Sequence, residues 1–119
     1  VRRWMAGQAP ASLYLSVITL GELAYGVARL EAGRKRDRLS RWVQEELTAQ
    51  FTGRVLPLDP EAAARWGELR ALGERRGRPR STADLQIAAI ALTHGMTLAT
   101  RNLADFEELG VPLVDPWLA

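Results

Sequence analysis

Short, mostly apolar segments of β-forming residues alternate along the chain with longer segments of helical periodicity. The expected strands cover residues 13–17, 54–58, 96–100 and 111–115. The expected helices cover residues 19–30, 34–51, 60–77, 81–94 and 103–109. Strands that alternate with helices predict a parallel sheet with helices on both faces. We therefore expect an α/β fold built as one domain, because 119 residues are enough for a single hydrophobic core.

Three of the expected helices begin with a Ser, Thr or Asn that is followed three residues later by an acid. The pairs are Thr19 with Glu22, Ser81 with Asp84, and Asn102 with Asp105. This spacing is typical of a helix cap, in which the first side chain accepts a hydrogen bond from a backbone N–H of the first turn. Each pair, taken alone, fits that structural role.

The alternative is that the three acids share one site. Residues 19–22 and 102–105 follow expected strands, and ligands of parallel sheets bind where strands end and helices begin. Asp84 has no strand directly before it, so its place at this edge is inferred. Converging carboxylates repel each other unless a cation binds, and carboxylates with Mg²⁺ are a common means of phosphodiester cleavage. The pattern leaves both alternatives open.

The composition limits the chemistry of such a site. The chain has no cysteine and one histidine, His94, which excludes a Cys-ligated metal and disfavours a His-rich one. Oxygen ligands favour Mg²⁺ or Mn²⁺. The net charge of +2 and the pI near 9.7 permit a nucleic-acid partner. Because we see neither a signal peptide nor an apolar run of about 18 residues, we expect a cytoplasmic protein without a membrane partner.

Three segments resemble a known family in their order along the chain. They read LSVITLGELAYGV, STADLQIAAIALTHGMTLATRNLADFEELGV and LVDPW. Together they resemble the PIN-domain ribonucleases, in particular the VapC-type toxins of toxin–antitoxin modules in their FitB-like branch. The resemblance implies a three-layer α/β/α sandwich and an endoribonuclease that cleaves single-stranded RNA with Mg²⁺ or Mn²⁺. It also implies a homodimer and a cognate antitoxin protein as partners.

The resemblance also implies roles for five residues. Glu22 matches the second acid of the family, and Asp84 matches the third, which is usually a direct metal ligand. The fourth position is ambiguous, because either Asn102 or Asp105 can fill it. Thr100 matches a small polar position that lines the same site. We therefore expect these acids and Asn102 to be catalytic, with Glu22, Asp84 and Asp105 as metal ligands.

The family's first strand has no match in this sequence. That strand ends in Asp-x-Asn and carries the first acid, so we expect an N-terminally incomplete PIN-like domain whose central sheet lacks its first strand. The neighbouring strands would then have exposed edges. We expect weak Mg²⁺ binding and poor RNA cleavage.

The alternative is a catalytically inactive fragment that only binds an antitoxin or a sister subunit. A third possibility is an unrelated doubly wound domain that binds a phosphorylated small molecule. It is disfavoured, because the sequence has no Gly-rich phosphate-binding loop.

Three further features of the sequence carry predictions. Arg78 and Arg80 precede the Asp84 helix and could bind an RNA backbone, although basic loops are often simply solvated. Trp42 and Trp66 occupy core-like helical positions, so we expect them to pack rather than to stack on bases. The helices 19–30 and 34–51 are apolar enough to provide a partner surface.

Overall fold

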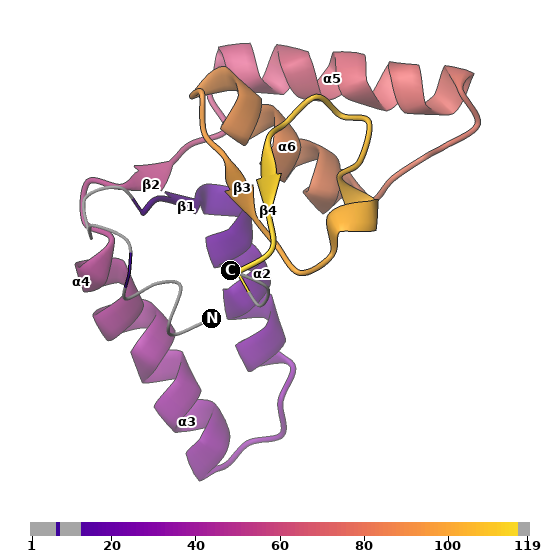
Figure 1. The fold of residues 1–119 in the computed structure, drawn as a ribbon. Helices are drawn as coiled ribbons and strands as arrows, with labels where there is room; N and C mark the ends of the chain where they lie inside the picture. The colour runs from indigo at the N-terminus through magenta and orange to yellow at the C-terminus, as the bar shows by residue number, and fades with distance from the viewer. Residues whose placement is uncertain (1–6, 8–12, 117–119) are drawn as a thin grey trace.

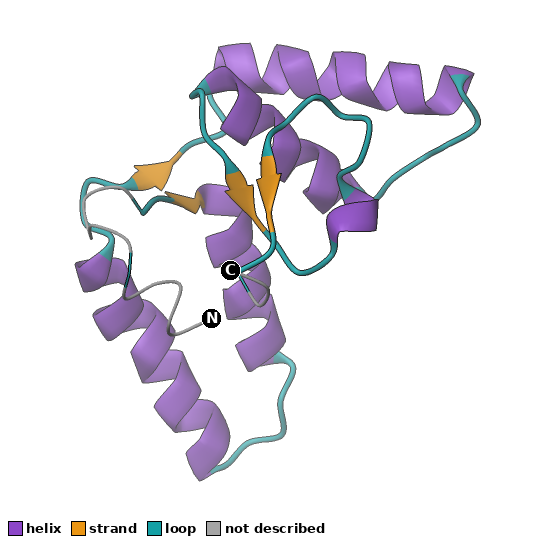
Figure 2. Cartoon of the chain, viewed as in Figure 1, coloured by secondary structure: helices purple, strands orange, loops and turns teal. Residues whose placement is uncertain are grey.

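The computed structural model describes residue 7 and residues 13–116. Its strands form two parallel pairs (Figures 1 and 2). β1 (Leu15–Ser16) pairs with β2 (Val55–Leu56), with Leu15 opposite Val55. β3 (Leu98–Ala99) pairs with β4 (Leu113–Val114), with Leu98 opposite Leu113. Both pairings are parallel, as the alternation of strands and helices predicted, but each strand is shorter than the segment expected for it.

The helices form two groups around these strands. α2 (Val17–Ala28) lies beside a second long helical segment made of α3 (Arg34–Arg41), a π-helical stretch (Trp42–Leu47) and α4 (Thr48–Gln50). α5 (Pro60–Arg75) packs along α6 (Thr82–Thr93) on the other side of the molecule. A single 3-10 turn (Leu103–Asp105) follows β3. Within the described part of the chain, no helix is long and apolar enough to cross a membrane.

α6 supplies the centre of the hydrophobic core. Its buried residues are Leu85, Ala88, Ala89, Ile90 and Ala91. Small alanine side chains let neighbouring elements approach closely, and close packing makes such positions sensitive to added volume. Phe106 and Val111, which follow β3, pack into the same cluster. The core therefore fixes the second half of α6 relative to the chain after β3.

Residues with polar side chains determine where the helices begin. Ser81 caps α6, and its Oγ accepts a 3.1 Å hydrogen bond from the backbone N–H of Asp84. Asp59 caps α5 in the same way, with Pro60 at the first helical position. Both starts agree with the sequence pattern. The predicted cap at Thr19 is wrong, because Ser16 caps α2 and accepts from the N–H of Thr19 at 2.9 Å.

The prediction that Trp42 packs in the core is also wrong. Trp42 is 40% exposed, whereas Val43, Leu47 and Phe51 on the same segment are buried. A π-helical stretch bonds each residue to the fifth along and holds more residues per turn. The buried face therefore follows a spacing of four residues from Val43, and Trp42 falls beside it. Trp66 is half-buried, as expected of a packing residue.

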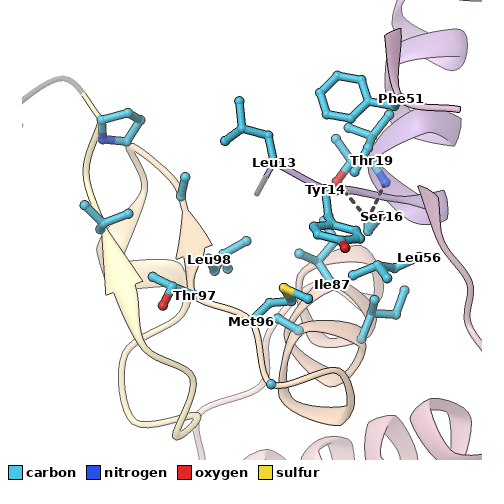
Figure 3. Close-up of a pocket in the computed structure, with 17 residues that line it drawn as sticks. Leu13, Tyr14, Ser16, Thr19, Phe51, Leu56, Ile87, Met96, Thr97 and Leu98 are labelled. Atoms are coloured by element: carbon cyan, nitrogen blue, oxygen red, sulfur yellow. Dashed lines mark hydrogen bonds between the residues drawn. The ribbon is translucent and has the colours of Figure 1, made fainter. Parts of the chain in front are cut away.

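A cleft of about 520 Å³ separates the two strand pairs. Figure 3 shows its lining, with β3 and β4 on one side and the segment around β1 on the other. Most of the lining is apolar and includes Leu13, Tyr14, Leu56, Ile87, Met96 and Leu98. Among the described residues β1 and β3 do not pair with each other. The sheet is therefore divided between β1 and β3 in the described part of the chain.

Candidate functional site

A polar hollow of about 470 Å³ lies at the N-terminus of α6. It is formed by the loop before α6, the first turn of α6 and the 3-10 turn after β3. Its lining residues are Gly77, Arg78, Pro79, Arg80, Ser81, Asp84, Ala104 and Asp105. The hollow thus brings together Asp84 and Asp105, two of the acids that the sequence singled out.

The start of α6 positions Asp84. The Ser81 cap uses the backbone N–H of Asp84, and the Asp84 side chain is half-buried. In a capping box the acid's side chain would return to the N–H of the cap residue, but no such hydrogen bond is present here among the described residues. The cap therefore leaves the carboxylate available. The first turn of a helix is also a favourable place for a negative charge, because the N-terminal backbone N–H groups point toward it.

The turn after β3 positions Asp105. Thr100 stands at the end of β3, and its Oγ1 accepts a 3.1 Å hydrogen bond from the N–H of Asn102. The carbonyl of Asn102 in turn accepts from the N–H of Asp105 at 3.1 Å. Asn102 makes no side-chain cap bond, and neither it nor Thr100 lines the hollow. Of the two candidates for the fourth position, Asp105 is therefore the one that shares the hollow with Asp84.

The carboxylates of Asp84 and Asp105 have no partner among the described residues, either by hydrogen bond or by ion pair. Two unpaired carboxylates that line one hollow repel each other, and a cation would remove that repulsion. Their oxygens are the ligand type that Mg²⁺ and Mn²⁺ prefer.

Glu22 lies elsewhere. It is exposed in the second turn of α2 and does not line the hollow. Within residues 13–116, no three acids or histidines come close enough together to hold a metal ion. The described residues therefore fit a divalent cation in the type of ligand, but as an incomplete set of two carboxylates.

Arg78 and Arg80 have partners within the protein. Arg78 Nη1 lies 2.7 Å from Glu108 Oε2. Arg80 donates to two backbone carbonyls, those of Ala104 at 3.0 Å and Glu107 at 2.5 Å. Both residues belong to the lining of the hollow. Sequence reasoning missed these contacts, because nothing in the spacing of residues 78–80 indicates which distant carbonyls they reach.

Comparison with known proteins agrees with this fold. The PIN domain family matches residues 1–111, which is most of the chain. This chain therefore belongs to the PIN-domain family.

The similar proteins are bacterial. The chain is 37% identical over 117 residues to the VapC ribonuclease Y4jK of Sinorhizobium fredii, a match that covers 98% of this chain and 84% of that protein. It is 35% identical over 114 residues to the toxin FitB of Neisseria gonorrhoeae, covering 96% and 82%. The crystal structure of FitAcB from Neisseria gonorrhoeae superposes with a TM-score of 0.91 at 34% identity, covering 99% of this chain and 85% of that one. The expected α/β PIN fold is confirmed.

Proposed function

We propose that this chain belongs to a metal-dependent endoribonuclease toxin that cleaves single-stranded RNA. The observation that carries the proposal is the pair of unpaired carboxylates, Asp84 and Asp105, in one polar hollow of a PIN-domain fold. The similarity to a VapC ribonuclease and to a toxin supports the same reaction and role.

In this proposal Asp84 and Asp105 hold a Mg²⁺ or Mn²⁺ ion. The ion would neutralise the charge that develops on the phosphate during hydrolysis. The N-terminus of α6 favours the negative charge of Asp84, and the hydrogen bond from Asn102 to Thr100 fixes the start of the turn that leads to Asp105. Arg78 and Arg80 add positive charge beside the carboxylates, which attracts the RNA backbone. Glu22 would take part only as a more distant acid, because it does not line the hollow.

The first test removes one carboxylate. Asp84→Asn should reduce Mg²⁺- or Mn²⁺-dependent cleavage of a fluorescent single-stranded RNA at least about tenfold, because a metal ligand is lost. Asp37→Asn is the matched control, since Asp37 is an exposed acid in the first turn of α3. If both variants lost activity equally, or if neither lost any, the assignment of Asp84 as a metal ligand would be contradicted.

A second candidate function is binding without catalysis, as an inactive partner of an antitoxin or a sister subunit. The observation that favours it is the absence of a third acid beside Asp84 and Asp105 among the described residues. Tight antitoxin binding without any metal-dependent cleavage would select this alternative.

We also propose the α2–α3 face as the partner surface for a homodimer or an antitoxin. Several large apolar side chains on or near it are exposed, namely Val17, Leu23, Tyr25 and Trp42. A groove between α2 and the α3 segment, lined by residues such as Ala24, Val27 and Val43, runs beside them. Exposed apolar patches of this kind are typical of protein–protein contacts.

A further inference from the structure

The loop between α5 and α6 is folded tightly against the end of α5. Arg78 donates its backbone N–H to the carbonyl of Gly73 at 2.8 Å. A Cβ at Gly73 would lie 2.9 Å from the carbonyl oxygen of Arg78, so only glycine fits there without a shift. Gly77, between them, has a φ of +68°, a conformation that favours glycine. The loop therefore reaches Arg80 in a defined conformation rather than as a loose connection.

Arg80 joins this loop to the turn after β3. Its guanidinium donates through Nη1 to the carbonyl of Ala104 and through Nη2 to the carbonyl of Glu107. These carbonyls stand on either side of Asp105 in the sequence. Arg80 itself directly precedes Ser81, the cap of the helix that carries Asp84. One side chain thus ties together the two backbone segments that carry the two carboxylates.

The geometry needs a guanidinium. Its planar fork presents several N–H donors in fixed directions and can bind two carbonyls at once, whereas a lysine ammonium is a single point of charge. The contacts go to carbonyl oxygens, and within residues 13–116 no ion pair joins Arg80 to Asp84 or Asp105. Arg80 can therefore hold the two segments in place without neutralising the carboxylates.

Arg78 provides a weaker second link. Its ion pair with Glu108 lies on the surface, with 49% and 61% of the two side chains exposed. Exposed ion pairs contribute little to stability because water and salt screen them. Arg80 makes two hydrogen bonds to the turn, to the carbonyls of Ala104 and Glu107, whereas Arg78 makes a single ion pair, so the Arg80 hydrogen bonds are the main connection.

We propose that Arg80 is a positioning residue, which holds the turn of Asp105 against the N-terminus of α6 so that Asp84 and Asp105 face one hollow. The role in holding the turn rests on the geometry alone. The consequence for a bound cation rests on the proposed function.

The first experiment measures the turn in the absence of metal. The N–H groups of Asp105 and Phe106 are hydrogen-bonded within the turn, so their exchange with deuterium reports on its opening. Arg80→Gln and Arg80→Lys should both speed this exchange about three- to tenfold, because each loses a two-carbonyl contact. Arg70→Gln is the matched control, since Arg70 forms an exposed ion pair with Glu74 on α5. If the N–H groups of the turn exchanged at the same rate in the Arg80 variants as in the Arg70→Gln control, the proposal would be overturned.

The second experiment measures Mn²⁺ binding by electron paramagnetic resonance with the same variants. Arg80→Gln should weaken binding at least about threefold in the unaltered background but have no further effect once Asp105 is replaced by Asn. The same loss in both backgrounds would overturn the positioning role, because Arg80 would then act independently of Asp105. Faster exchange in a protein that binds no Mn²⁺ would support the role in holding the turn and overturn the proposed function instead.

Discussion

At the scale of single residues, one acidic residue can take part in a helix cap and also line a candidate metal site. At Asp84 the cap uses the backbone N–H, and the carboxylate remains without a partner in the described structure. The two interpretations of the Ser81–Asp84 pair are therefore compatible, since they concern different atoms of the same residue. The Thr19–Glu22 pair differs, because its helix begins earlier, at Val17, and the acid falls in the second turn.

The cap at Ser81 can be tested separately from the carboxylate. Ser81→Ala should lower the free energy of unfolding by about 1 kcal/mol, because the N–H of Asp84 loses its acceptor. Ser81→Thr retains a hydroxyl and should lose much less. Urea unfolding measures both. Equal losses in the two variants would mean that the hydroxyl does not stabilise the helix.

At the scale of elements, the alanines of α6 decide how closely its neighbours pack. Ala88 is fully buried and belongs to the cluster that includes Phe106 and Val111. Ala88→Leu should destabilise the protein by about 1 to 3 kcal/mol, because the added methyl groups have no space. Ala71→Leu, at an exposed position of α5, is the control. Thermal unfolding measures the stability of both variants. Equal midpoint temperatures would contradict the packing argument.

The exposed apolar residues of α2 carry a prediction about association. Leu23 and Tyr25 are 36% and 62% exposed. If α2 joins two copies, replacing both residues by Ser should raise the dissociation constant of the dimer at least about tenfold, because buried aromatic and aliphatic anchors dominate such contacts. Glu68→Ser, at an exposed position of α5, is the control. Sedimentation velocity measures the change, and a strictly monomeric protein at high concentration would contradict the expectation.

At the scale of the whole molecule, the divided sheet and the incomplete acid set occur together. The described residues supply two carboxylates to the hollow and leave an apolar cleft between β1 and β3. The further strand and acid that the family resemblance implies stay a prediction.

That expectation gives a measurable prediction. A version extended by a first strand that ends in Asp-x-Asn, taken from a relative, should bind Mg²⁺ at least about tenfold more tightly than the present chain, because a third carboxylate joins the set. It should also cleave RNA faster. Calorimetric titration of both proteins measures the affinity. The same extension with Asn in place of the acid is the control, and equal binding by all three proteins would contradict the prediction.

The sequence predicted the type of each element better than its contacts. Alternation of apolar strands and helices led to the parallel pairs, and the expected helix starts at residue 60 and at the Ser81 cap are correct. Trp42 was misplaced because a π-helical stretch has no sequence signal in a periodicity count. The contacts of Arg80 depend on where residues 104 and 107 come to lie after folding, which no local pattern specifies.

Each parallel strand pair is formed within one continuous stretch of chain. Residues 15–56 run from β1 through α2, α3 and α4 to β2, and residues 60–114 run from α5 and α6 through β3 to β4. The contacts between the two stretches include those of α2 and β1 with α6. A backbone cut at residues 57–59 would therefore sever no strand pairing, and the two pieces could be produced apart and recombined as a split protein.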